Sequence, residues 1–441
     1  MKKFIQTIKN IFSIEELRIR ILNTIGFLII FRLGSFVVLP GVDPTQLTED
    51  VGGIFGLLNT FLGGAFSRAS VFGLGIMPYI SASIVLQLMT VAVPYFQKLQ
   101  KEGDSGRKKI NQITRVLTIF ICLAQCVGYI NATIPAAAIN PQLNPFLFQV
   151  SSMVILTSGT IFCMWLGERI TDKGIGNGIS MLIMIGIISR FPASLWYEIV
   201  ELKGLSGALL SILELVALFL VIMATVALVQ ATRRIPVQYA KQVVGNKIYG
   251  GQRQYIPLKV NSSGVMPIIF AQSLMFLPAL IAGIWREDSD IAQYIGTTFS
   301  DIQSWQYNLL FAVLIILFTF FYTAITINPN QIADDMKRNG GFIPGIKPGK
   351  QTSEFIDSVL SKITLPGSFF LAVIAILPAF AMMANVSTTF AQFYGGTSLL
   401  IMVGVILDTL QQIESYLLMR HYEGMMKSGR VKGRTQNAAV A

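Results

Sequence analysis

The sequence predicts an all-α polytopic membrane protein with ten transmembrane helices. Of its 441 residues, 53% are apolar and only 13% are charged, and the mean hydropathy is +0.62. A soluble domain carries about 25% charged residues and cannot bury so much apolar surface in one core. Disordered chains and coiled coils need a more polar composition. In addition, apolar runs long enough to cross a bilayer recur along the whole chain.

The candidate spans follow from length, because a helix needs about 20 mostly apolar residues to cross the hydrocarbon core. The first half of the chain contains Ile21–Leu39, Val71–Val93, Val116–Ile134, Phe148–Leu166 and Ile179–Tyr197. The second half contains Ala208–Val229, Val265–Ile284, Leu309–Ile327, Ile363–Met383 and Leu399–Met419. Arg190 and Pro192 interrupt the fifth span, which is therefore the weakest.

The distribution of Lys and Arg sets the orientation. These residues gather in every second loop and at both chain ends, and the net charge is +11. Excess Lys and Arg marks the cytoplasmic side of a membrane, so we expect both termini to be cytoplasmic. The predicted organisation is an amphipathic N-terminus (1-20), two five-helix halves (21-205 and 206-419) and a tail (420-441). Five spans per half permit an inverted repeat.

The loop after the first span contains a short apolar segment, 52-70, that cannot cross the membrane. Gly52, Gly53, Gly63 and Gly64 flank its apolar centre. Such a segment is typical of a re-entrant half-helix, which is tolerated only when it packs inside protein. The alternative is an interfacial helix that lies flat outside the membrane.

Two long basic loops, 231-263 and 328-362, lie on the predicted cytoplasmic side. The first holds six Lys or Arg and no acidic residue, and the second contains the Pro- and Gly-rich run Phe342–Lys350. Pro and Gly favour rigid turns, and rigid basic projections suit an anionic partner such as nucleic acid or an acidic protein surface. The alternative is ordinary positive-inside charge that faces lipid headgroups.

The sequence gives no sign of enzymatic chemistry. Its one histidine, His421, is near the C-terminus, and its three cysteines fall inside apolar runs. We therefore expect no metal site, no cofactor and no catalytic residues. Charge inside the spans is scarce, with Asp408 as the acidic candidate for an ion site. This favours a channel with an apolar constriction over an ion-coupled transporter.

Several long and unusual strings are spread along the chain. They are Gly63–Ser70, Leu74–Ile84, Lys101–Gly103, Trp165–Glu168, Gly174–Ser180, Pro257–Asn261, Phe342–Gly349 and Gly395–Ile401. Together they make the sequence similar to the SecY family, the pore subunits of the bacterial protein-conducting channel, and the resemblance covers nearly the whole chain in order.

The resemblance implies a clamshell of two halves around an hourglass pore with a ring of apolar side chains at its waist. By matching motifs, the ring is Ile76, Ile80, Ile179, Ile183, Ile269 and Ile401. The residues themselves agree in part, since the first two pairs are each four residues apart and so share a helical face. Stiff β-branched side chains also suit a seal. The implied function is passive conduction of unfolded secretory polypeptides, with lateral release of apolar helices into lipid.

The resemblance also implies a plug and a lateral gate. The plug is the segment Gly52–Arg68, and its residues are Ile54, Leu57, Leu58, Asn59, Phe61, Leu62, Phe66 and Arg68. Gln87 and Gln125 are candidate polar contacts near the lateral gate, where signal sequences reach lipid. The alternative for either glutamine is an ordinary contact within the helix bundle.

Partners follow from the same resemblance. The basic loops would dock the ribosome and the motor ATPase SecA through Arg233, Arg234, Lys247, Lys337, Arg338, Lys347 and Lys350. SecE and SecG would flank the helices in the bacterial inner membrane. Lys347 and Asn246 stand where many relatives have arginine, and a lysine cannot form the bidentate contacts of arginine. The competing hypotheses are a secondary transporter with its site at Asp408 and a non-conducting membrane scaffold.

Overall fold

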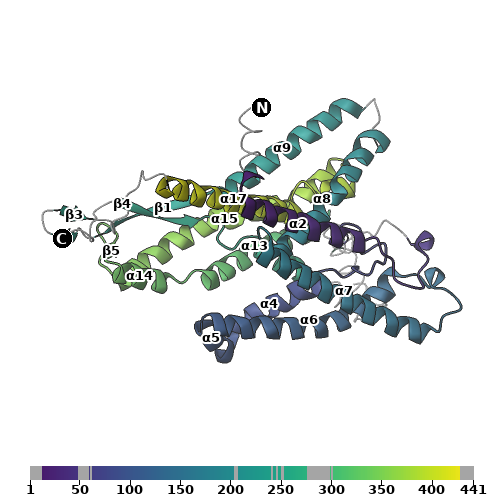
Figure 1. The fold of residues 1–441 in the computed structure, drawn as a ribbon. Coiled ribbons are helices and arrows are strands. Elements are labelled where there is room, and N and C mark those ends of the chain that lie inside the picture. The colour runs from purple at the N-terminus through teal and green to yellow at the C-terminus, as the bar shows by residue number, and fades with distance from the viewer. Residues whose placement is uncertain are drawn as a thin grey trace. The chain divides into compact units, whose positions relative to one another are not determined.

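The computed structural model of the chain is predominantly helical (Figure 1). It describes residues 12–47, 59, 62–202, 207–239, 242–244, 247–249, 253–275, 298 and 301–427. The chain divides into two compact units. Unit 1 comprises Met1–Val51, Leu58–Ser189 and Val405–Ala441, and unit 2 comprises Gly52–Leu57 and Arg190–Gly404. The helices α8 and α17 each begin in one unit and end in the other.

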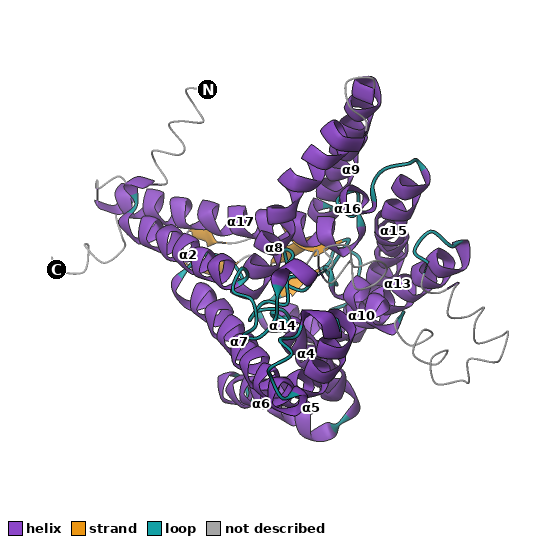
Figure 2. Ribbon diagram, turned by 90° about the vertical axis from the view of Figure 1, so that its right-hand side faces the viewer, coloured by secondary structure: helices purple, strands orange, loops and turns teal. Residues whose placement is uncertain are grey.

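Unit 1 is a bundle of apolar helices. Its elements are α2 (Glu15–Gly34), η1 (Pro44–Gln46), α4 (Met77–Ala92), α5 (Pro94–Lys101), α6 (Asp104–Thr133), η2 (Ala136–Ala138), α7 (Pro145–Lys173), most of α8 (Gly178–Trp196) and most of α17 (Gly396–Lys427). The helix α6 contacts α4, α5 and α7, and α7 also contacts α2 (Figure 2). At one end of the α6–α7 pair, the Arg115 guanidinium donates to both carboxylate oxygens of Glu168 at 3.0 and 2.8 Å.

A cluster of large apolar side chains forms the core of unit 1. Phe31 of α2 stacks on Phe72, with ring centroids 6.0 Å apart. The other buried members are Ile76, Cys163, Leu166, Ile170 and Leu182. Lipid solvates apolar side chains as well as protein does, so close packing rather than water exclusion holds such helices together. Gly159 of α7 allows that closeness, because a Cβ there would collide with the backbone oxygen of Val71.

Unit 2 combines helices with all the strands that the structure describes. Its helices are η3 (a π-helix, Tyr197–Leu202), α9 (Ala208–Gln230), α10 (Met266–Leu274), α13 (Trp305–Thr326), α14 (Pro329–Arg338), α15 (Lys350–Met383) and α16 (Thr388–Ala391). Its strands are β1 (Thr232–Tyr239), β2 (Gln242–Val244), β3 (Lys247–Tyr249), β4 (Arg253–Lys259) and β5 (Gly341–Phe342). The helix α13 packs against α10 and α15. The strands form a three-stranded sheet in the order β4-β1-β5 and the separate pair β2-β3.

A helix lies at each of the ten predicted spans. Among the described residues, seven helices are long and apolar enough to cross a membrane, and α4 with α5, bent by 100°, forms an eighth candidate. The other two positions hold α2, with 20 residues, and α10, with nine. The interruption expected in the fifth span is absent, since α8 continues through Arg190 and Pro192 as far as Trp196.

One predicted span start was wrong, and two helices extend well before their predicted spans. The second span does not begin at Val71: the chain turns up to Ile76, Gly75 adopts a φ of +51°, and Pro78 occupies the first turn of α4. Proline is favoured there because the first turn has no partner for its missing N–H. The helix α6 begins at Asp104, before the third predicted span, and α15 begins at Lys350, before the ninth, and runs for 34 residues.

We expect Gly159→Ala to destabilise unit 1 by about 1–3 kcal/mol, the usual cost of forcing extra volume into a packed interior. Gly128→Ala on α6 is the matched control, because a Cβ there meets no atom within 4 Å. Thermal unfolding of the purified protein in detergent measures both variants. A Gly159→Ala protein that unfolds at the parent's temperature would contradict the close approach of α7 to Val71.

Candidate functional site

The structure brings three of the six predicted ring residues together in unit 1. Ile76 is 3% exposed and lies in the core cluster, and Ile80 and Ile179 are half-buried and pack against it. Ile76 is the residue before α4, and its carbonyl accepts the first helical hydrogen bond from the Ile80 amide at 3.1 Å. The two side chains therefore share a face, as their spacing predicts.

The other predicted ring residues are distributed over three helices. Ile183 is half-buried on α8, one turn beyond Ile179. In unit 2, Ile269 is half-buried on α10 and Ile401 of α17 is 7% exposed. The aliphatic side chains thus come from the α4, α8, α10 and α17 segments, and their assignment to a ring stays a prediction.

The described part of the predicted plug is the 62–70 segment, which is irregular backbone packed inside unit 1. Leu62 and Phe66 are 5% and 3% exposed, and Asn59, just before the segment, is 2% exposed. The Asn59 side chain accepts a hydrogen bond from the Ser67 amide at 3.1 Å. The predicted plug residues Ile54, Leu57, Leu58 and Phe61 lie outside the described residues.

Aromatic and cationic side chains hold the 62–70 segment in place. The Tyr129 hydroxyl of α6 donates to the Phe66 carbonyl at 2.8 Å, and the two rings meet edge to face with centroids 4.8 Å apart. From α2, the Arg32 guanidinium donates to the Gly63 carbonyl at 3.4 Å. The Arg68 guanidinium lies 4.6 Å from the centroid of the Phe36 ring, within the range of a cation–π contact.

Gly63 is required at its position for steric reasons. Its φ is +62°, a conformation that L side chains rarely adopt. A Cβ there would also lie 2.8 Å from the Ser189 hydroxyl and 2.9 Å from the Gly186 carbonyl of α8. The glycine therefore lets the segment lie against α8, the helix that carries Ile179 and Ile183.

The predicted gate glutamines lie on neighbouring helices of unit 1. Gln87 is half-buried on α4, Gln125 is half-buried on α6, and these two helices pack together. Both positions suit a polar contact within the bundle. Their role at a lateral gate stays a prediction.

The two basic loops fold together into one module, which we call the two-loop module. Strand β1 of the first loop pairs antiparallel with β4, with Ile235 opposite Ile256. On its other edge β1 pairs with β5 of the second loop, with Gln238 opposite Phe342. Figure 1 shows these strands beside α14. The shared apolar core consists of Ile235, Val237, Leu258, Met336, Ile343, Ile356 and Leu360.

Most of the predicted docking residues project from this module. Arg234 is exposed on the face of β1 opposite to the buried Ile235 and Val237, as side-chain alternation in a strand requires. Arg233 is exposed near the start of the strand, before the buried positions. The remaining exposed docking residues are Lys337 and Arg338 at the end of α14, and Lys347 and Lys350 around the start of α15. Cations at a helix C-terminus are favourable because of the helix dipole. Lys247 lies on β3, and its side chain is outside the described set.

Sequence reasoning missed two buried acids in unit 2. Glu214 lies inside the predicted span Ala208–Val229 and is 9% exposed, and Glu198 of η3 is 1% exposed. A Glu198 carboxylate oxygen accepts the Ser387 amide at 3.1 Å, and the Tyr394 hydroxyl donates to the Glu214 carbonyl at 2.8 Å. By contrast, Asp408, the acid singled out for an ion site, is exposed on α17.

Within the described part of the chain, no three His, Cys, Asp or Glu side chains are arranged to hold a metal ion. The three cysteines are buried, and the sulfur atoms of Cys122 and Cys126 lie 4.0 Å apart on successive turns of α6. The candidate functional features among the described residues are therefore the apolar side chains of the predicted ring, the buried 62–70 segment and the basic two-loop module.

Comparison with known proteins gives one family. The SecY family model matches residues 70–410. A protein translocase subunit SecY of Streptomyces scabiei is 44% identical over 431 residues, which cover 94% of this chain and 98% of the relative. The corresponding subunit of Mycobacterium bovis is 41% identical over 448 residues, covering 97% of this chain and all of the relative. These matches confirm the resemblance found in the sequence motifs.

Solved structures share the fold. A protein-conducting channel aligns with a TM-score of 0.62 at 15% identity, covering 90% of this chain and 92% of its own. A SecY protein, described as having a plug domain that stabilises the closed state and maintains a membrane seal, gives 0.59 at 17% identity with the same coverage. Sec61 in a canine ribosome–channel complex gives 0.57 at 14% identity, again with the same coverage. The predicted fold class is confirmed.

We expect Tyr129→Phe to loosen the 62–70 segment, because the change removes the donor to the Phe66 carbonyl and keeps the ring. A hydrogen bond contributes about 1 kcal/mol net, so amide hydrogen exchange in the segment should become about fivefold faster. Exchange measured by mass spectrometry checks this. Tyr95→Phe, at a side chain that is 60% exposed, is the control. Unchanged exchange in Tyr129→Phe would show that this bond does not hold the segment.

Proposed function

The chain belongs to the SecY family, and on that premise we infer that it is the central channel subunit of a Sec translocase. The observation that carries this conclusion is 44% identity to a translocase subunit along 94% of the chain, together with the fold of a protein-conducting channel. The protein is a multi-pass membrane protein of a non-catalytic family. We propose that it acts as a passive conduit for unfolded polypeptides and that a partner supplies the driving force.

The proposed seal is a ring of aliphatic side chains. In unit 1, Ile76 belongs to the core cluster, and Ile80 and Ile179 pack against that cluster. Ile183, Ile269 and Ile401 would complete the ring. Apolar constrictions close by expelling water. Isoleucine suits this task because its branched Cβ restricts χ1 and keeps the surface stiff. A chain passing through would displace these side chains without breaking any hydrogen bond.

The proposed plug is the segment 52-70, and its described part supports the role. The segment is buried, and side chains of Arg32, Phe36 and Tyr129 hold it by single hydrogen bonds and ring contacts. A backbone hydrogen bond from the Leu39 amide to the Ala69 carbonyl at 2.9 Å adds to these. Each such contact contributes about 0.5–1.5 kcal/mol, so they can be given up one after another when a polypeptide enters. Gln87 and Gln125 would act at the lateral gate, where signal sequences pass into lipid.

We propose that the two-loop module docks the ribosome and the motor ATPase SecA. A relative with the same fold, Sec61, forms a ribosome–channel complex. The exposed basic residues Arg233, Arg234, Lys337 and Lys347 project from a folded base, so their spacing is fixed before a partner arrives. Preorganisation of this kind lowers the entropic cost of binding. SecE and SecG are the proposed membrane partners, the inner membrane is the proposed location, and both termini would be cytoplasmic.

We expect Ile80→Gly and Ile183→Gly to make the idle channel leak ions. Removing an isoleucine side chain removes about 2 kcal/mol of hydrophobic free energy, which corresponds to a roughly thirtyfold change in a closed-to-open ratio. Conductance in planar bilayers measures the leak, and export of a substrate with a defective signal sequence should rise with it. Ile19→Gly, at a side chain of α2 that is 49% exposed, is the control. Ring variants that conduct no more than the parent would exclude the seal.

A photoreactive residue placed at Ile80 or Ile269 should crosslink to a stalled secretory polypeptide, since both side chains would line its path. The same probe at Leu209, 85% exposed at the start of α9, should not. Crosslinking yield on gels measures the contact. A scaffold that only recruits partners through its basic loops would give no adduct at any of the three positions.

A further inference from the structure

Four side chains, two of them from helices other than α7 and α8, hold the turn between α7 and α8 in unit 1. The Ile175 amide donates to the Thr24 hydroxyl of α2 at 3.0 Å, and the Gly176 amide donates to the Gln412 side-chain oxygen of α17 at 2.8 Å. The Gly178 amide donates to the Thr171 hydroxyl at 2.9 Å. The Asn177 side chain then accepts from the first amides of α8 at 3.1 and 3.2 Å, as an N-cap does.

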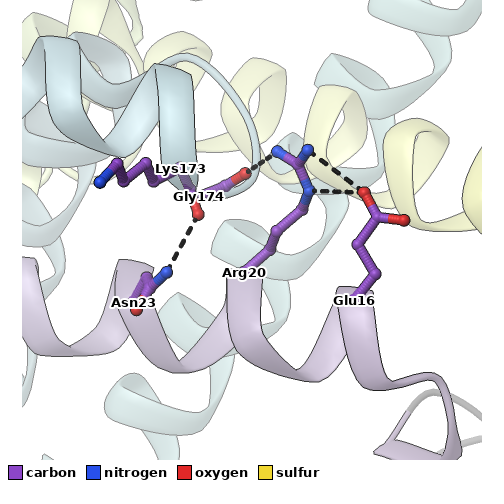
Figure 3. Close-up of polar contacts among 5 residues, drawn as sticks. All are labelled: Glu16, Arg20, Asn23, Lys173 and Gly174. Carbon is purple, nitrogen blue, oxygen red and sulfur yellow. Dashed lines mark hydrogen bonds and ion pairs between the residues drawn. The ribbon is translucent and has the colours of Figure 1, made fainter.

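The helix α2 holds the carbonyl side of the same turn. Figure 3 shows the Arg20 guanidinium donating to the Gly174 carbonyl and the Asn23 amide donating to the Lys173 carbonyl, each at 3.3 Å. Arg20 is itself oriented by Glu16, at 3.3 Å. On the α17 side, the Tyr416 ring lies 5.5 Å from the Arg20 guanidinium. The turn is thus bonded from two helices that are far apart in the sequence.

Sterics leave the turn little freedom to shift. A Cβ at Gly174 would collide with the Thr24 hydroxyl and lie 2.6 Å from the Ile170 carbonyl. A Cβ at Gly178 would collide with the Gly167 carbonyl of α7. The backbone of the turn is therefore in van der Waals contact with the α7 backbone and with the Thr24 hydroxyl of α2. Together with the hydrogen bond to Gln412, these contacts make the position of the turn depend on the positions of α2, α7 and α17.

The turn determines where α8 begins, and α8 carries two of the proposed ring residues. Ile179 directly follows Gly178 and packs, as Ile80 does, against the core cluster that contains Ile76. A helix is stiff along its axis, so a shift of the turn moves Ile179 and Ile183 together. We propose that Thr24 and Gln412 are positioning residues for the seal: they hold the α7–α8 turn so that α8 presents Ile179 and Ile183 at the correct level. This rests on the proposed function.

The test compares variants that remove each hydrogen-bond acceptor with variants that keep it. Gln412→Leu and Thr24→Val remove the acceptors, whereas Gln412→Glu and Thr24→Ser retain an oxygen. Gln412 is exposed, so its substitutions do not disturb the core, and Gln411→Leu on the same helix turn is the matched control. Conductance of the idle channel and export of a substrate with a defective signal sequence are measured at equal protein abundance.

We expect Gln412→Leu and Thr24→Val each to raise idle conductance about fivefold, the change that loss of one hydrogen bond produces. Gln412→Glu, Thr24→Ser and Gln411→Leu should match the parent. A general loss of stability would lower export of all substrates and would not be relieved by retaining one oxygen. If Ile179→Gly leaks while Gln412→Leu and Thr24→Val do not, the positioning role is wrong and the seal stands. If Ile179→Gly itself does not leak, the proposed seal fails.

Discussion

The constraint on which the structure depends is that backbone polar groups inside a bilayer must find partners within the protein. Helices meet this demand internally. Buried irregular backbone has the same need wherever it lies in a protein, and the chain contains such backbone in the 62–70 segment and in the α7–α8 turn. In both places some of the partners come from distant helices: Tyr129 and Arg32 for the first, Thr24 and Gln412 for the second. Each irregular segment is therefore specified by the bundle around it, and it can change position only when those partners are given up.

Close approach of backbones supports this arrangement. Gly159 lies against Val71, and Gly178 lies against Gly167, at positions where a Cβ would collide. Glycine in a helix costs about 0.5–1 kcal/mol relative to alanine, so these residues are retained for packing rather than for helix stability. Among helices surrounded by lipid, such contacts replace the hydrophobic driving force that is available in water. The same contacts make unit 1 a stiff frame for the side chains of the proposed seal.

Much of the membrane architecture could be predicted from composition and apolar run length, because lipid imposes one simple rule on a spanning helix. The ten spans each correspond to a helix. The misses have definite causes. Hydropathy marks only the apolar part of a helix, so it gave the span from Ile363 but did not show that the same helix extends back to Lys350. Glu214 was overlooked because its neighbours in α9 are strongly apolar.

Only those features of the site that depend on short sequence motifs could be predicted. Spacing placed Ile76 and Ile80 on one face, and this held because an i to i+4 hydrogen bond joins them. The roles of Tyr129, Thr24 and Gln412 were not visible, since a single polar residue in a helix carries no local signal of the partner it will meet 63 to 236 positions away. The sheet was missed for the same reason: β1 pairs with β4 of its own loop and with β5, which follows it by about a hundred residues that include α10, α13 and α14.

The central place of β1 in the three-stranded sheet also limits how the chain can be rebuilt. Because β1 has β4 on one edge and β5 on the other, neither basic loop carries a complete hydrophobic core, and Ile235 and Val237 would lose part of their cover if residues 341–360 were removed. Chimaeras between related subunits should therefore exchange both loops together. Peptides copied from either loop alone are poor mimics of the native surface, and antibodies raised against them would recognise a different shape.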